Sequence, residues 1–170
     1  MGLTGCGKPD KIAVQSVLKK RPEQRAKADS ERRRVMNIKR FVWAAIAVFL
    51  GFQVTDPIIH MVILGKTYQS MPAMWRPGME SMMWIMHAGG LVMAFLFVYI
   101  FFKGYENKGI GEGVRFGLVL GLFANIPYAF YSYVIYPLPF SLCAQWFVYG
   151  MIQFVICGVI AAAVYRPADS

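Results

Sequence analysis

Two histidines inside long apolar stretches have the residue type and spacing best suited to chemistry. His60 and His87 are the two histidines of the chain. Counted from the ends of their stretches at about 1.5 Å per helical residue, their depths agree within roughly 5 Å. Paired imidazoles at one level suit haem b, and an imidazole beside a thioether, here that of Met86, suits copper. The sequence therefore allows a haem b or copper site, although methionine is also an ordinary filler of apolar helices.

A polar face on the first apolar stretch suggests two other interpretations. Gln53, Asp56 and His60 are spaced three and four residues apart, so they share one face of a helix. Polar and ionisable groups at membrane depth are costly and normally turn inward. They form either an internal hydrogen-bond network, with Asp56 paired to His60 one turn away, or a pathway for protons or small solutes through Asp56 and His60.

Side-chain amides in the other apolar stretches extend this polar set. Gln145 is expected close to the level of the two histidines. A deeper layer is expected to contain Gln53, Asp56, Asn125 and Gln153. The sequence therefore predicts an intramembrane polar network that links the helices through hydrogen bonds.

Patterns typical of enzyme active sites are lacking. Ser132 and Ser141 have no identifiable base, the apolar stretches hold no pair of carboxylates, and no glycine loop is followed by Lys and Ser or Thr. We therefore assign no catalytic residue and expect a non-enzymatic structural or accessory component.

Four long apolar stretches must position these residues. They cover residues 41–64, 82–102, 116–136 and 140–165, and Asp56 is their one formal charge. A bilayer core about 30 Å thick is crossed by roughly 20 apolar helical residues. With 57% hydrophobic residues and a mean hydropathy of +0.45, the chain is too apolar for an ordinary soluble domain. We predict an all-α polytopic membrane protein with a bundle of four transmembrane helices.

The distribution of cationic residues predicts the orientation of this bundle. Successive sides of the membrane carry twelve, two, three, none and one of the 18 Lys and Arg residues, so alternate sides carry sixteen and two. The positive-inside rule then places both termini in the cytoplasm, in a bacterial cytoplasmic (inner) membrane. The basic residues before Phe41 are expected to contact anionic lipid headgroups, not nucleic acid. Aromatic residues gather at the predicted outer boundary: Trp75, Trp84, Tyr133, Tyr136 and Trp146.

Glycine spacing predicts how the helices pack. Gly113, Gly117 and Gly121 lie four residues apart on one helical face, where small residues let backbones approach closely in lipid. This pattern favours packing within the bundle over a homodimer interface, while a homo-oligomer or a larger membrane complex stays open. Pro57 and Pro127 are expected to kink the first and third helices. Possible packing mates are Ala88, Gly89, Gly90 and Ala94, or Gly158, Ala161 and Ala162.

The first 35 residues differ from the rest of the chain in composition. Residues 1–35 are rich in Lys and Arg, and we expect a disordered or surface-lying tail. Met36 is a possible native start, with 36–170 forming the membrane domain.

Cys143 and Cys157 are expected on one helix about 21 Å apart, too far for a disulfide within one chain.

The middle loop and its flanks carry a resemblance to a known class of proteins. The sequences Lys103-Gly104-Tyr105-Glu106 and Gly109-Ile110-Gly111-Glu112-Gly113-Val114-Arg115-Phe116-Gly117, with Tyr136-Pro137 further on, resemble small bacterial integral membrane proteins of unknown function. The resemblance covers about Met36 to Pro167. It implies a four-helix inner-membrane protein and no particular activity.

Overall fold

The described part of the chain is helical throughout its regular structure. The computed structural model describes residues 37–165, and the predictions on the basic tail and on Met36 lie outside these residues. No strand occurs between 37 and 165. The segments are α2 (Ile38–Pro57), the π-helix η1 (Ile58–Ile63), α3 (Gly65–Gln69), the 3-10 helices η2 (Pro72–Met74) and η3 (Met79–Met82), α4 (Met83–Lys103), α5 (Ile110–Ile126), the π-helix η4 (Pro127–Tyr131), α6 (Ser132–Ile135) and α7 (Phe140–Val164).

Four continuous helical stretches are long and apolar enough to cross a membrane. They run Ile38–Ile63, Met79–Lys103, Ile110–Ile135 and Phe140–Val164. The predicted all-α class with four span-length helices is therefore confirmed.

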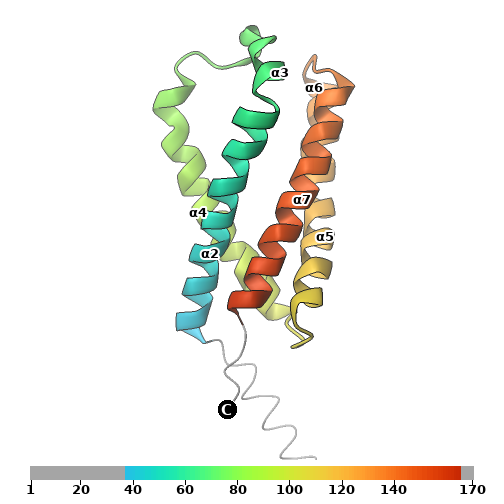
Figure 1. The fold of residues 1–170 in the computed structure, drawn as a ribbon. Helices are drawn as coiled ribbons and strands as arrows, with labels where there is room; N and C mark the ends of the chain where they lie inside the picture. The colour runs from blue at the N-terminus through green and yellow to red at the C-terminus, as the bar shows by residue number, and fades with distance from the viewer. Residues whose placement is uncertain (1–36, 166–170) are drawn as a thin grey trace, which may run out of the picture. The chain divides into compact units, whose positions relative to one another are not determined.

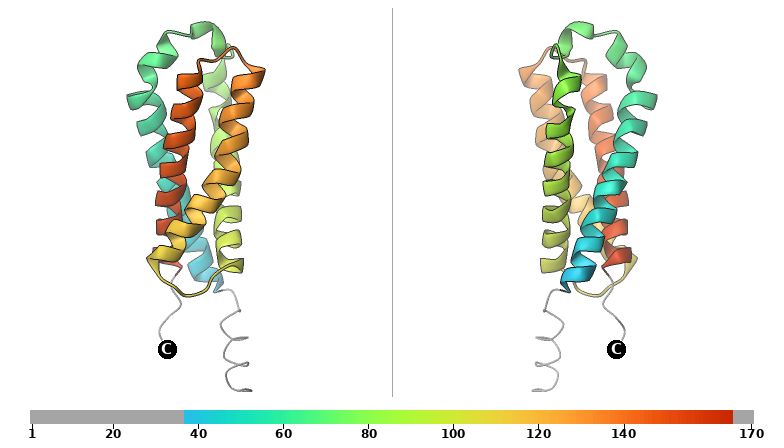
Figure 2. Two further views of the ribbon diagram at one scale, coloured as in Figure 1. Left: turned by 90° about the vertical axis from the view of Figure 1, so that its right-hand side faces the viewer. Right: turned by 90° about the vertical axis from the view of Figure 1, so that its left-hand side faces the viewer.

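The four long helices form two hairpins. α2 packs against α4, α5 packs closely along α7, and the α2–α7 interface joins the two pairs (Figure 1). The start of α2, the end of α7 and the α4–α5 loop lie at one end of the bundle (Figure 2). The α2–α4 connection and the α6–α7 turn lie at the other end.

Two clusters of buried apolar residues make the core. The larger cluster joins α2, α4 and α7, and its buried members are Ala44, Ala45, Val48, Phe52, Ala94, Phe97, Val98, Phe101, Cys157, Ala161, Ala162 and Tyr165. The smaller cluster lies toward the other end and contains Ile59, Leu64, Leu138, Leu142 and Cys143. Cys143 and Cys157 are both buried free thiols.

The glycine series of α5 lies against α7. A Cβ added to Gly117 would lie 2.5 Å from the carbonyl oxygen of Phe154 and 2.7 Å from the Cα of Val155. A Cβ on Gly113 would overlap the backbone of Gly158. An added Cβ would force the neighbouring backbone to shift. The close approach of the two helices therefore requires glycine at these two positions.

The helix type changes at Pro57 and at Pro127. α2 ends at Pro57 and η1 follows, while η4 begins at Pro127. In η1 the Leu64 N–H donates to the carbonyl oxygen of Ile59, five residues earlier, at 2.9 Å. Proline lacks the N–H of the regular ladder, so a wider turn is a recognised way to continue the helix past it.

The third span begins earlier than the predicted residue 116. α5 starts at Ile110, after Gly109 with φ +75°. The Glu112 carboxylate accepts hydrogen bonds from the backbone N–H groups of Glu106 and Lys108, which fastens the loop onto the first helical turn. Arg115 therefore belongs to the helix and not to the loop.

Large apolar side chains cover the outside of the bundle. In the most apolar 18-residue segment of each span, only 17% to 33% of the residues are buried by the rest of the described chain. In α4 the buried residues begin at Ala94, so the first half of that helix adds none to the core. The exterior thus has the apolar character that a lipid environment requires.

Candidate functional site

A polar group in the middle of the bundle links α2 to α7. The Gln153 side-chain amide donates to Asp56 Oδ1 at 2.7 Å and to Thr55 Oγ1 at 2.8 Å. The Thr55 hydroxyl in turn donates to the carbonyl oxygen of Gly51 at 2.8 Å. Gln153 is 7% exposed, so its amide is almost removed from the surroundings. These bonds cross the interface between the two hairpins.

The other predicted amides have different positions. Asn125, 6% exposed, donates to the Gly121 carbonyl of its own helix at 2.9 Å. Its side chain occupies the space above Gly150, where a Cβ would overlap it. Gln145 is exposed on the surface of α7 and not directed into a polar layer. Depth along a helix places residues at one level but leaves the direction of each side chain open.

His60 belongs to a second polar group, near the α2–α4 connection. Its Nδ1 lies 2.7 Å from the Tyr68 hydroxyl, and Trp146 Nε1 donates to the same hydroxyl at 2.6 Å. The indole can only donate, so the Tyr68 oxygen accepts from Trp146 and its O–H is available to His60. Burial raises the pKa of Tyr68 to about 12, against the opposing effect of the Trp146 hydrogen bond, so the hydroxyl keeps its proton.

Tyr68 was missed by the sequence analysis because it follows the apolar stretch. It lies eight residues after His60, roughly two helical turns, and that spacing was the available signal. The predicted pairing of Asp56 with His60 is replaced by bonds to Gln153 and Tyr68. The π-helix that follows Pro57 changes the register between Asp56 and His60, because its turns are wider than those of an α-helix.

His87 belongs to a third polar group. The Gln53 amide nitrogen lies 2.6 Å from His87 Nδ1 and ties the first half of α4 to α2. Met86 is 66% exposed. The two histidines thus have separate hydrogen-bond partners, and residues 37–165 contain no group of three or more His, Cys, Asp and Glu side chains placed to hold a metal ion.

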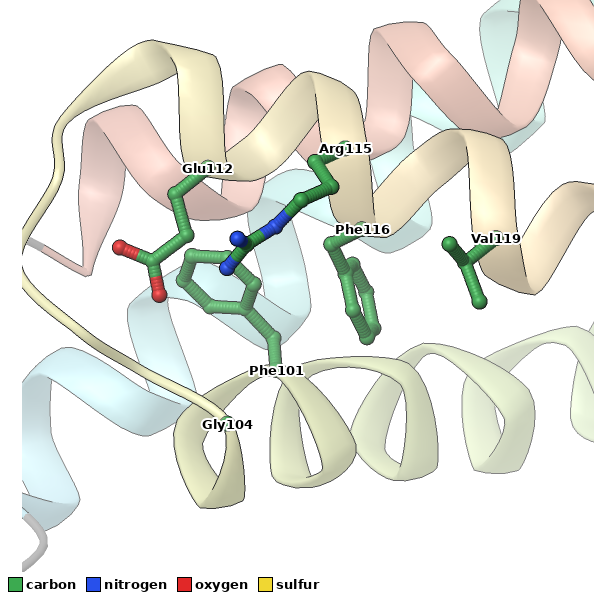
Figure 3. Close-up of a pocket in the computed structure, with 6 residues that line it drawn as sticks. All are labelled: Phe101, Gly104, Glu112, Arg115, Phe116 and Val119. Atoms are coloured by element: carbon green, nitrogen blue, oxygen red, sulfur yellow. The ribbon is translucent and has the colours of Figure 1, made fainter.

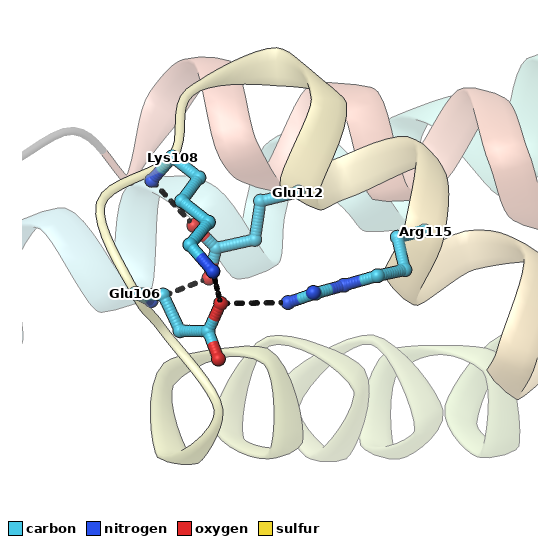
Figure 4. Close-up of polar contacts among 4 residues, drawn as sticks. All are labelled: Glu106, Lys108, Glu112 and Arg115. Carbon is cyan, nitrogen blue, oxygen red and sulfur yellow. Dashed lines mark hydrogen bonds and ion pairs between the residues drawn. The ribbon is translucent and has the colours of Figure 1, made fainter.

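A compact polar arrangement closes the α4–α5 loop. Glu112 is 4% exposed, and its two carboxylate oxygens accept from the backbone N–H of Glu106 at 2.6 Å and of Lys108 at 2.9 Å. The Glu106 carboxylate binds Lys108 Nζ at 2.6 Å and Arg115 Nη2 at 2.9 Å through one oxygen, Oε2 (Figure 4). Hydrogen bonds and charge from Lys108 and Arg115 lower the pKa of Glu106 from its ordinary value.

A pocket of about 220 Å³ lies beside this loop, between the end of α4 and the start of α5. Figure 3 shows Phe101 rising from α4 toward Phe116 and Arg115 of α5. The residues that line the pocket are Phe101, Gly104, Glu112, Arg115, Phe116 and Val119. The pocket therefore combines aromatic walls with one cationic and one acidic side chain.

Comparisons of the chain with protein-family models, with curated proteins and with solved structures found no match.

Proposed function

We propose that this chain is a multi-pass protein of the bacterial cytoplasmic membrane with both termini in the cytoplasm. Its four-helix bundle acts as a non-enzymatic structural or accessory component. The observation that carries the proposal is the contrast between exterior and interior. Four span-length helices present exposed apolar side chains, while the interior polar side chains bond to one another across helices.

The accessory role is supported by how these polar groups are used. Gln153 joins α7 to α2, Trp146 joins α7 to Tyr68, and Gln53 joins α2 to α4. Hydrogen bonds of this kind are common contacts between membrane helices. The Nδ1 atoms of His60 and His87 bond to different partners, Tyr68 and Gln53, so a haem or copper site shared by the two histidines would have to use their Nε2 atoms.

Membrane extraction followed by spectroscopy tests this proposal. We expect the chain to stay with the membrane in alkaline carbonate and to dissolve in detergent. We expect the purified protein to show no Soret band and no stoichiometric copper. Release by carbonate would refute the membrane assignment. A Soret band that is lost in both His60→Ala and His87→Ala would replace the accessory role with haem binding.

A further inference from the structure

We propose that the crevice between α4 and α5, beside their connecting loop, binds an anionic glycerophospholipid. The phosphate lies against Arg115 and Lys108, and an acyl chain follows Phe116 and Val119 along α5. This inference rests on the membrane location proposed above and adds a specific ligand to it.

The depth of the pocket matches that of a lipid headgroup. The pocket is bounded by Gly104, just after the end of α4, and by Glu112 in the first turn of α5. When the two spans cross a bilayer, their ends lie in the headgroup region. A phosphodiester is the ligand group found at this level.

The walls of the pocket continue into an apolar surface. Phe101 and Phe116 stack edge to face with ring centroids 5.2 Å apart. One turn further from the loop, Val119 is 65% exposed. Because α5 packs chiefly on α7, and α4 packs chiefly on α2, no other helix covers the open side of the crevice within the described chain, and this side would face lipid. A molecule with a polar head and an apolar chain fits this sequence of surfaces.

The charges around the pocket favour an anion. The loop and its flanks carry Lys103, Lys108 and Arg115 against Glu106 and Glu112, a local balance of one positive charge. Both oxygens of the Glu112 carboxylate accept hydrogen bonds from backbone N–H groups of the loop, so this carboxylate holds the loop and does not pair with the cationic side chains. Glu106 holds both Lys108 and Arg115 through a single exposed oxygen. A phosphate offers several oxygens and can bind the planar guanidinium of Arg115 through two N–H groups at once.

Lipid titration of the purified full chain in detergent tests the site. Native mass spectrometry would compare phosphatidylglycerol with phosphatidylcholine of the same acyl chains, and with soluble glycerol 3-phosphate. We expect phosphatidylglycerol to bind about tenfold more tightly than phosphatidylcholine, because the quaternary ammonium of choline neutralises the phosphodiester that both lipids carry and is repelled by Lys108 and Arg115. We expect no measurable binding of glycerol 3-phosphate. Equal binding of the two lipids would refute recognition of the headgroup charge, and binding of glycerol 3-phosphate as tight as that of the lipid would refute the role of the acyl chain.

Matched variants separate the lipid site from the loop ion pairs. Arg115→Gln should remove the preference for phosphatidylglycerol, while Arg76→Gln, the same change on an exposed residue of the α2–α4 connection, should keep it. Glu106→Gln should keep or increase the preference, because it releases Arg115 and Lys108. If Glu106→Gln instead abolishes the preference, Arg115 acts through its ion pair and the proposal fails.

A second pair of variants tests the acyl groove without changing charge. Val119→Trp should obstruct the groove and weaken phosphatidylglycerol binding, whereas Val134→Trp, at a site 81% exposed on α6, should not. Equal binding by the two tryptophan variants would refute the groove. These results do not depend on the carbonate test. If the chain stays with the membrane in carbonate but binds both lipids equally, the lipid site is refuted and the proposed membrane location is not.

Discussion

At the residue scale, the interior of the bundle depends on side chains that satisfy one another across helices. Gln153 supplies hydrogen bonds to both Thr55 and Asp56, and Tyr68 accepts from Trp146 while bonding His60. A buried acceptor that loses its donor bears a desolvation cost that the intact pair avoids. Stability should therefore be more sensitive to these donors than to exposed amides of the same type.

Truncation of Gln153 tests this dependence. Gln153→Ala leaves Asp56 and Thr55 without their donor and should destabilise the bundle by about 1 kcal/mol or more. The exposed Gln145→Ala on the same helix is the matched control and should melt like the unmodified protein. Thermal unfolding in a mild detergent measures both. Equal melting temperatures for the two variants would show that the Gln153 bonds add nothing to stability.

The loop charges predict an acid-dependent component of stability. Because the folded state lowers the pKa of Glu106 below its ordinary 4.5, the ion pairs contribute fully above that pH. Their contribution is lost as the pH falls through the lower folded value. Melting curves between pH 7 and pH 3 should show this loss in the unmodified protein and not in Glu106→Gln. Since Glu106 is exposed, high salt should shrink the difference between the two. A difference that persists unchanged in 1 M salt would contradict this account.

At the element scale, α5 and α7 form the tightest pair of helices. Gly113 and Gly117 lie against the α7 backbone, and Gly158 of α7 meets Gly113 in return. Close backbone approach gives many weak contacts along both helices, which is the main attraction available between apolar helices in lipid.

Two glycines of α5 make a matched test of this interface. Gly117→Ala places a Cβ against the Phe154 carbonyl and should lower the melting temperature, because the backbones must separate. Gly111→Ala has no atom within 4 Å of the added Cβ and should be neutral or stabilising, by up to about 1 kcal/mol from helix propensity. If Gly117→Ala melts like Gly111→Ala, the close approach is not a source of stability.

The spans were predictable from sequence, whereas the contacts between them were not. Each span is one continuous apolar run, so length and hydropathy locate it without knowledge of its neighbours. The predicted start of the third span lies six residues after the observed start of α5, because 110–115 contains Glu112, Arg115 and two glycines and has the composition of a loop. Which polar residues meet depends on helix rotation and on the wide turn after Pro57, and neither follows from depth.

At the scale of the whole molecule, the chain consists of two sequential hairpins joined through α2 and α7. The start of α2, the end of α7 and the α4–α5 loop share one end of the bundle, which agrees with an even number of crossings. Among residues 37–165, five Lys and Arg residues lie at that end, namely Lys39, Arg40, Lys103, Lys108 and Arg115, against Lys66 and Arg76 on the α2–α4 connection.

Reporter fusions test the orientation that this asymmetry predicts. A reporter after Arg166 should be active in the cytoplasm, and one inserted in 66–80 should be active outside. Adding lysines to the α2–α4 connection should weaken the preference. The reverse pattern in the unmodified chain would invert the bundle and place His60 and Tyr68 near the cytoplasm.

The hydrogen bond between Asp56 and Gln153 has a consequence for how the protein is made. Its two residues are separated by 97 positions, and Gln153 lies in α7, which is synthesised after α2, α4 and α5. In the proposed membrane location, Asp56 enters the bilayer before its partner has been synthesised, and an aspartate costs up to roughly 2.5–3.5 kcal/mol there, the figure for the centre of an inserting helix. The apolar residues around it have to offset that cost until α7 arrives. On this proposal, insertion as well as the finished bundle sets a lower limit on the hydrophobicity of the first helix.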